Sequence, residues 1–158
     1  MTAVETTSQI LEGSKLSLKL FRVMMRATKA IQTHAAEHIN SCQLCPSDFM
    51  ILEALLHKGS LPTCQIGSKI LLTLTNGSMT AAVDRLEQRG LVQRIAHETD
   101  RRLKLVALTE KGTNLISETF ETHEALIDRV TAGLSDEEKR LFIELARKLG
   151  KFADSLSP

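Results

Sequence analysis

The 158-residue sequence contains no tryptophan and no tyrosine, and only five phenylalanines. A hydrophobic core must therefore be built mainly from leucine, isoleucine, valine, alanine and methionine. No apolar run approaches the roughly 18 residues of a membrane-spanning helix. The chain has only three cysteines and shows no secretory signal, so a disulfide framework is not expected. These absences predict a chain that works in the cytoplasm and does not enter a membrane.

The sequence also lacks the arrangements that catalysis requires. It shows no nucleophile–base pair, no paired carboxylates that would line a cleft, and no glycine-rich phosphate loop. We therefore expect no enzymatic activity and no cofactor. The net charge is only +1, but residues 84–104 carry six Lys or Arg against four Asp or Glu. A nucleic-acid binder of this composition would have to gather its cations on one face.

Hydrophobic periodicity predicts a mainly α-helical chain of the α+β class. Apolar residues recur at three- and four-residue steps in most of the sequence, which is typical of amphipathic helices. Two strand-like runs, LVQRIA and LKLVALT, interrupt this pattern between residues 91 and 109. Helices are expected at residues 14–40, 46–58, 63–71 and 76–89, from residue 110 onward, and in a last segment that runs to about residue 155.

Local signals indicate where several of these helices begin and end. Thr75 is the expected N-cap of the helix at 76–89, and Gly90 is expected to end it. Ser135 and Glu138 have the spacing of a capping box, which opens the last helix.

The helices at 63–71 and 76–89 have the proportions of a helix-turn-helix. The second would present Asn76, Ser78 and Thr80 on its first turns, and such small side chains can approach base edges or phosphates. Arg85 and Arg89 lie one turn apart and are candidates for contacts with backbone phosphates. The alternative is an ordinary amphipathic helix with a solvated polar face.

The turn between the two strand-like runs, HETDRR, is long and charged and contains no glycine. A hairpin that only reverses direction would need about two residues, so this one is expected to project from the domain. Arg102 at its tip can enter a minor groove, and Asp100 can orient its guanidinium. Arg101 and Lys104 lie nearby and add positive charge. The alternative is a solvated charged turn, but a recognition-like helix just upstream favours a DNA-binding wing.

The segments LTNGSMTAAVDRLEQRGLV and DRRLKLVALTEKG resemble the MarR family of bacterial transcription regulators. That family typically reads T-x-x-V-D-R-L-E-x-x-G-L-V and then D-x-R, V-x-L-T-x-x-G. The order of elements also matches over nearly the full length. The matching residues are Val83, Asp84, Arg85, Leu86, Glu87, Gly90, Leu91 and Val92 in the first block and Asp100, Arg102, Val106, Leu108, Thr109 and Gly112 in the second.

The resemblance implies a winged helix-turn-helix homodimer that binds a pseudo-palindromic double-stranded DNA operator. Such a protein is usually a repressor. It implies one chain with two lobes: a helical dimerisation lobe from residues 14–45 and 110–158, and a DNA-binding lobe from residues 46–109. Thr75, Ser78 and Thr80 fall at contact positions of the recognition helix, and Asp100 and Arg102 form the wing pair. Ala81 departs from the larger polar residue of many members, so base preference cannot be transferred.

The family responds to a small molecule, an oxidant or a metal, and the sequence leaves all three open. KILLTLTNGSMTAAVDRLE is most similar to a branch that answers quinones and other phenolic electrophiles. An aromatic effector could contact His34, His38 and Phe49, although each of these residues is also compatible with simple packing or solvent exposure.

The other two signals would involve the cysteines. Cys42 and Cys45 form a CxxC, and Cys45 is the expected N-cap of the helix at 46–58, where a thiolate is favoured. No cation is close to it in sequence. His34 and His38 with the two cysteines offer four potential zinc ligands, but the spacing matches no standard finger. The remaining alternative is a metal- or partner-binding dimer that does not bind DNA.

Overall fold

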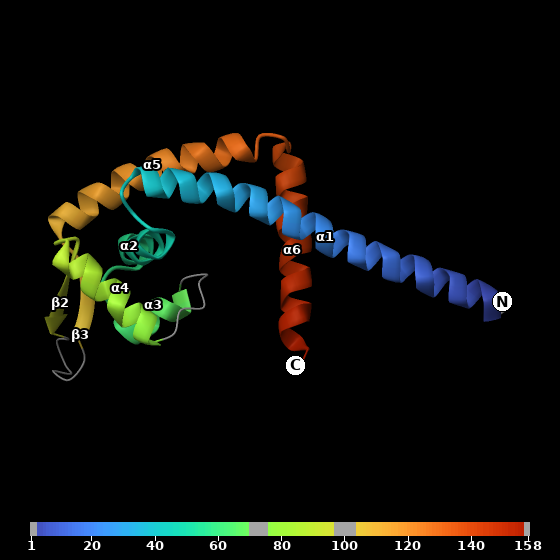
Figure 1. Ribbon diagram of the computed structural model, residues 1–158, viewed down its shortest axis with the longest axis horizontal. Helices are drawn as coiled ribbons and strands as arrows, with labels where there is room; N and C mark the ends of the chain where they lie inside the picture. Colours follow the sequence, from blue (N-terminus) through green and yellow to red (C-terminus); the bar gives the residue numbers. More distant parts are fainter. Residues whose placement is uncertain (1–2, 70–75, 97–103, 157–158) are drawn as a thin grey trace.

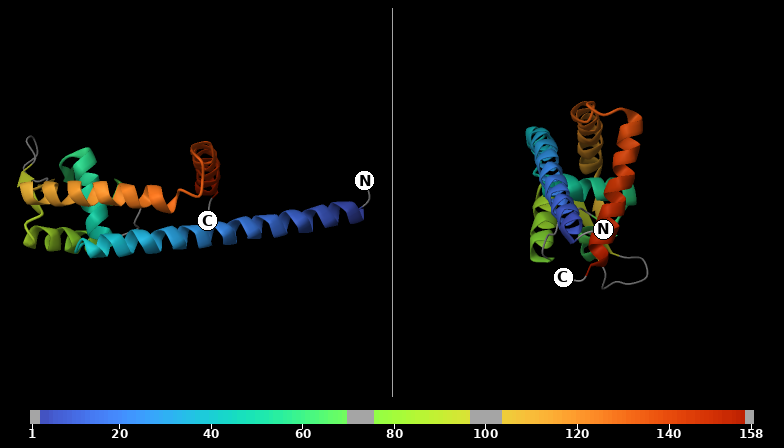
Figure 2. Two further views of the ribbon diagram at one scale, coloured as in Figure 1. Left: turned by 90° about the horizontal axis from the view of Figure 1, so that it is seen from above. Right: turned by 90° about the vertical axis from the view of Figure 1, so that its right-hand side faces the viewer.

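The computed structural model describes residues 3–69, 76–96 and 104–156, and its architecture is set by two long helices (Figure 1). Helices α1 and α5 run antiparallel, side by side, along the long axis of the molecule, and the N-terminal part of α1 extends beyond the other elements (Figures 1 and 2). Helices α2, α3 and α4 and a small sheet gather at the opposite end. The elements are α1 (Ala3–Ser41), α2 (Pro46–Lys58), β1 (Leu61–Pro62), α3 (Thr63–Lys69), α4 (Asn76–Gln88), β2 (Val92–Ala96), β3 (Lys104–Leu108), α5 (Glu110–Val130) and α6 (Asp136–Ser155).

The structure confirms the mainly helical class and corrects one helix boundary. Helix α1 begins at Ala3, whereas the sequence predicts a start at residue 14. A single glycine inside a helix costs only about 1 kcal/mol, so Gly13 does not end the helix. The capping box is present, because the Ser135 side chain accepts from the Glu138 amide and the Glu138 carboxylate accepts from the Ser135 amide. None of the described helices is both long and apolar enough to cross a membrane.

The sheet has three antiparallel strands in the order β1-β3-β2. Strands β2 and β3 pair from Val92 opposite Leu108 to Ala96 opposite Lys104, as the hairpin prediction requires. Sequence analysis missed β1, whose Leu61 lies opposite Val106. A strand of two residues that ends in proline carries too little periodicity to be recognised.

The hydrophobic core lies between α2, α3, α4, the sheet and the start of α5. Its members are almost all aliphatic, as the scarcity of aromatic residues requires. The most deeply buried side chains are Ile51 and Leu52 of α2, Ile66 of α3, Val83 and Leu86 of α4, Leu91 and Val92 at β2, Val106 of β3, and Ile116 of α5.

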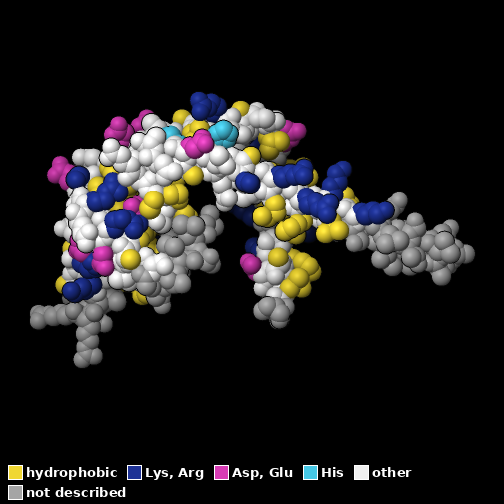
Figure 3. Space-filling view, viewed as in Figure 1, with side chains coloured by type: hydrophobic (Ala, Val, Ile, Leu, Met, Phe, Trp, Pro, Cys, Tyr) yellow, Lys and Arg dark blue, Asp and Glu magenta, His cyan; other side chains and the backbone are white. Residues whose placement is uncertain are grey.

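Helix α6 has a wide apolar face that nothing in the described part of the chain covers. No residue of this helix is buried, and its large apolar side chains are 40% to 64% exposed. An open apolar groove of about 420 Å³ separates α6 from α1 and is lined by Leu20, Phe21 and Met24 on one side and Leu149 on the other. Figure 3 shows apolar side chains on both helices at this crossing. The exposed side chains of α6 are Leu141, Phe142, Ile143, Leu145, Leu149 and Phe152.

A close backbone contact fixes the start of α5 against the turn between α4 and β2. The Thr109 amide donates to the Leu91 carbonyl at 3.1 Å, and the Thr109 hydroxyl donates to the Gly90 carbonyl at 2.7 Å. Gly112 lies directly over this turn, and a Cβ at this position would be 1.9 Å from the Leu91 carbonyl oxygen. Only glycine therefore fits here.

We predict that Gly112→Ala destabilises the fold by about 3 kcal/mol, because the backbone must move either at the start of α5 or at the turn that contains Leu91. Urea unfolding followed by circular dichroism measures the change. Gly133→Ala is the matched control, since no atom lies within 4 Å of a Cβ placed there. Equal stability of the two variants would show that the contact does not constrain the fold.

Candidate nucleic-acid interface

Helix α4 separates its apolar side chains from its small polar ones. Met79, Val83 and Leu86 are buried in the core. Ser78 and Thr80 are exposed on the other side of the helix. The first of the described residues in this helix is Asn76, whose side chain lies outside the described part, and the predicted N-cap Thr75 lies outside it altogether.

The C-terminal end of α4 has the geometry that the sequence predicts. Gly90 has φ of +70°, a left-handed conformation that favours glycine. Its amide donates to the Glu87 carbonyl at 2.9 Å, and the Leu91 amide donates to the Leu86 carbonyl at 3.0 Å. This pair of bonds is a Schellman motif, which ends the helix and directs the chain into β2.

A buried carboxylate on α2 binds Arg85 of α4 and Arg89, which follows the end of α4. Asp48 is only 2% exposed and accepts hydrogen bonds from Nη2 and Nε of Arg85, the latter at 3.2 Å. Arg89 Nη1 lies 3.5 Å from the same carboxylate, and Arg89 Nη2 donates to the Gln43 carbonyl at 2.9 Å. The hydrogen bond to Asp48 is the main reason that the pKa of Arg85 is raised. Sequence analysis suggested phosphate contacts for both arginines and missed Asp48, which lies 37 residues from Arg85.

A second ion-pair cluster joins α4 to the strand that leads into the hairpin. Arg94 of β2 donates to the carboxylates of Asp84 and Glu87 on α4, and its amide donates to Glu87 at 3.2 Å. These bonds, the one to Asp84 foremost, raise the pKa of Arg94. The Arg94 side chain is 23% exposed, whereas those of Asp84 and Glu87 are 49% and 39% exposed. Helix α4 and the hairpin are therefore held together by charge as well as by the core.

The predicted wing tip is described only at its base. Lys104 begins β3 and is exposed, while Val106 on the same strand face is buried. Asp100, Arg101 and Arg102 lie outside the described residues, so their arrangement remains a prediction.

The junction between α1 and α2 brings a cysteine to the base of the recognition-like helix. Cys45 is the N-cap of α2, as predicted, and its Sγ lies 3.1 Å from Ser47 Oγ. Arg85 Nη2 lies 3.5 Å from the same sulfur. The folded chain thus supplies the cation that sequence proximity did not reveal. Cys42 is half-buried nearby.

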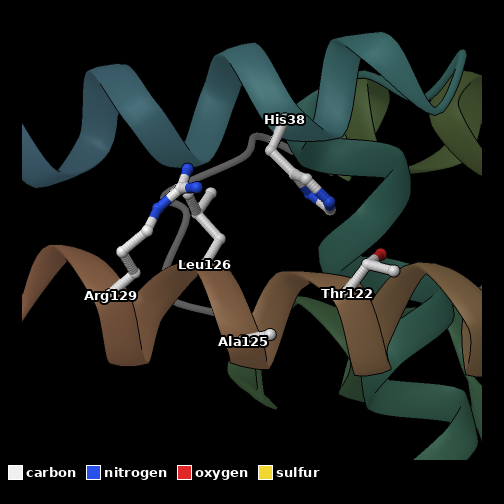
Figure 4. A pocket seen from close by; sticks show the side chains of 5 residues that line it. All are labelled: His38, Thr122, Ala125, Leu126 and Arg129. Carbon is white, nitrogen blue, oxygen red and sulfur yellow. The ribbon is translucent and has the colours of Figure 1, made fainter.

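A pocket opens between α1 and α5 on the side of His38. Two adjoining hollows of about 330 Å³ each share His38 and Thr122. Figure 4 shows His38 pointing from α1 toward α5, and the Arg129 guanidinium reaching from α5 into the same opening. Ala125 and Leu126 of α5 also line this opening. Cys42, Leu115, Glu118 and Thr119 complete the second hollow. Thr122 and Arg129 are lining residues that sequence analysis missed.

The other predicted effector residues have different surroundings. His34 is exposed on α1, whereas Phe49 is buried at the start of α2. The Phe49 ring packs against His123 of α5, with centroids 4.8 Å apart. His123 Nδ1 lies 3.4 Å from His38 Nδ1. Burial, and secondarily the nearby His38, lowers the pKa of His123.

The predicted four-ligand zinc set does not form in the described residues. No group of three or more His, Cys, Asp or Glu side chains there is arranged to hold a metal. Helix α1 continues to Ser41, so His34 faces solvent instead of turning toward the two thiols. This hypothesis about His34, His38, Cys42 and Cys45 is therefore wrong.

Comparisons with known proteins agree on one family. A protein-family model described as MarR family matches residues 44–104 of this chain. The chain is 45% identical to the HTH-type transcriptional regulator MhqR of Bacillus subtilis (strain 168), over 85% of this chain and 91% of that protein. A MarR family protein from Bacillus stearothermophilus has a similar structure, with a TM-score of 0.73, 26% identity, and coverage of 90% and 98%. An Escherichia coli MarR mutant complexed with operator DNA shares the fold at a TM-score of 0.72 and 20% identity, covering 83% and 93%.

We predict that Arg85→Gln destabilises the protein by about 1–3 kcal/mol, because the buried Asp48 would keep only the longer contact to Arg89. Urea unfolding measures the change. The control is Arg140→Gln, which breaks an exposed pair with Glu137 and should shift stability by no more than about 0.5 kcal/mol. Similar losses in the two variants would contradict a structural role for Arg85.

The lowered pKa of His123 predicts a pH-dependent stability. The unfolded chain takes up this proton near pH 6.5, while the folded chain resists it to lower pH. The contribution of neutral His123 to the free energy of unfolding is therefore complete above about pH 6.5, and it is lost as pH falls through the folded pKa. Unfolding free energies between pH 5 and 8, measured with EDTA, should show a smaller loss in His123→Gln than in wild type or His34→Gln. An unchanged pH slope in His123→Gln would refute the prediction.

Proposed function

Because the chain belongs to the MarR family of DNA-binding transcription regulators, which are not enzymes, we propose that it is a homodimeric repressor. It binds a pseudo-palindromic operator in the cytoplasm and leaves it when a small phenolic or electrophilic effector binds. Family membership disfavours the alternative of a dimer that does not bind DNA. The observation that carries the proposal is the bracing of α4 from both sides, by Asp48 of α2 and Arg94 of β2.

Helix α4 serves as the recognition helix in this proposal. Its outward face carries Ser78 and Thr80, which are short enough to let the helix backbone approach a major groove. Asn76 and Thr75 would act at its N-terminal end, where helix amide groups also favour a phosphate. Because α4 is held to α2 and β2, it can enter the groove without a large ordering cost.

Arg85 of α4 and the adjacent Arg89 would contribute to the phosphate contacts without leaving Asp48. Arg85 remains 47% exposed while it is paired, and a guanidinium has five donors. Arg101, Arg102 and Lys104 would extend the positive surface along the wing. Arg102, oriented by Asp100, is proposed to enter the minor groove.

A second copy of the chain is the proposed cover for the apolar faces of α6 and α1. These faces meet where α6 crosses α1, away from α4, so a dimer formed there leaves both recognition helices accessible (Figures 1 and 3). A two-fold dimer also matches a two-fold operator, with half-sites about one helical turn apart.

The DNA-binding proposal is tested with an operator selected from random duplexes and fluorescence anisotropy. Arg102→Ala should weaken binding by about 1–3 kcal/mol, while light scattering still gives the mass of a dimer. Arg140→Gln, in the exposed pair of α6, should bind like wild type. The wild-type affinity should also fall steeply with salt, because phosphate contacts release counterions. A flat salt response, or full affinity in Arg102→Ala, would contradict the proposed interface.

The pocket beside His38 supports an aromatic effector with an acidic or hydroxyl group. Arg129, Thr122 and His38 provide polar groups, and Ala125 and Leu126 provide an apolar wall. The pocket lies between α1 and α5, close to Phe49 and therefore to α2, which holds α4 through Asp48. An effector that separates α1 from α5 can thus displace α2.

Cys45 favours a second way of sensing an electrophile. The Arg85 guanidinium lies 3.5 Å from the sulfur, and the Cys45 thiol could add to a quinone. The adduct would occupy the space between α2 and α4 and disturb the pairing of Arg85 with Asp48. The same effector class can therefore act through the pocket or through the thiol.

The two routes are separated by measuring DNA release with a quinone and with a non-electrophilic phenol. If the pocket senses the effector, Arg129→Ala impairs release by both compounds, while Cys42→Ser/Cys45→Ser responds like wild type. If the thiol senses it, the double cysteine variant loses only the quinone response, and the control Cys64→Ser, at an exposed cysteine, keeps it. Normal release in all three variants would contradict both sensing sites.

A further inference from the structure

Helix α1 carries a row of positive charges that the proposed operator contacts do not use. The cations recur at alternating steps of four and three residues, so they lie along one side of the helix. All of them are exposed, and within the described part of the chain none forms an ion pair with a carboxylate. No aspartate or glutamate occurs in residues 13–36. The members of this cationic row are Lys15, Lys19, Arg22, Arg26 and Lys29.

The cationic row faces away from the apolar side of the same helix. Leu20 and Met24 line the groove beside α6. Arg22 and Arg26 each follow one of them by two residues, which is about 200° around a helix of 3.6 residues per turn. In Figure 3, Lys and Arg side chains follow the upper side of α1, and apolar side chains gather on its lower side. A second copy that covers the apolar side therefore leaves the row in solvent.

The length and charge of the row match a double-stranded nucleic acid. Its 15 residues span about 21 Å, at about 1.5 Å per helical residue. A DNA duplex presents one negative charge per about 1.7 Å, and hence about 12 phosphates over that length. We propose that the cationic row binds the phosphates of a second segment of duplex DNA while α4 and the hairpin hold the operator. Phosphate contacts carry no base information, so this binding is independent of sequence.

The placement of the row favours a second segment over the operator itself. Helix α4 and the hairpin lie at the opposite end of the molecule from the projecting part of α1, and the row is on the other side in the same view (Figures 1 and 3). The inference rests on the proposed operator binding in one respect, because a protein held on DNA meets neighbouring segments at high effective concentration. An anionic membrane is disfavoured, since an interfacial helix inserts its apolar side, which here is directed at α6.

The test uses operator duplex fixed on beads and saturated with the full chain, and it measures capture of a fluorescent duplex that lacks the operator. Wild type should capture this second duplex at low salt and lose it as salt rises. The variant Lys19→Gln/Arg22→Gln/Arg26→Gln should capture it at least about tenfold less, because three phosphate contacts are lost.

The matched control removes three exposed cations from α6. Arg147→Gln/Lys148→Gln/Lys151→Gln has the same change of charge and should capture the second duplex like wild type. Both triple variants should keep the wild-type affinity for the operator and the mass of a dimer, since all six residues lie outside the proposed operator interface.

Four results would overturn the proposal. They are equal capture by the two triple variants, no capture by wild type, loss of operator affinity in the variant of the row, and row-dependent binding to phosphatidylserine vesicles without capture of the second duplex. Failure of the proposed function has a different signature. A chain that binds no operator would refute that function, whereas the row would still be expected to bind the non-operator duplex and to lose it in the triple variant of α1.

Discussion

The position of the recognition helix depends on one buried carboxylate. Asp48 lies in the first turn of α2 and is almost completely excluded from water, so its charge must be matched by Arg85 of α4 and by Arg89 just beyond it. These ion pairs join α2 to α4 above the core that both helices share. Arg94 repeats the arrangement from the other side and fixes the hairpin to α4.

Helix α2 contacts both α4 and α5 and so connects the DNA-binding helices to the long helices. Its N-cap Cys45 contacts Arg85, its Asp48 binds α4, and its Phe49 packs on His123 of α5. The residues of α2 that contact the proposed DNA-binding helix, the proposed reactive thiol and the surroundings of the His38 pocket therefore lie within one helical turn and its cap. In the proposed mechanism, a shift of α1 relative to α5 would reach α4 through these few contacts.

The sequence contained enough local information to predict most helices, the hairpin and the inward face of α4. Met79 and Val83 follow helical periodicity, and Gly90 needs only local geometry to end its helix. The partners of Arg85, Arg94 and His123 could not be predicted in this way, because each contact joins elements that only tertiary packing brings together. The need for glycine at position 112 could not be predicted locally either, because it arises from the close approach of the Leu91 carbonyl to this residue.

The central claim is that two copies of this chain present two braced α4 helices to successive major grooves. Hydroxyl-radical footprinting on a selected operator tests it most directly. The account predicts two protected patches, related by two-fold symmetry and centred about 10 base pairs, or a multiple of one helical turn, apart. A single protected patch, or two patches without two-fold symmetry, would contradict it.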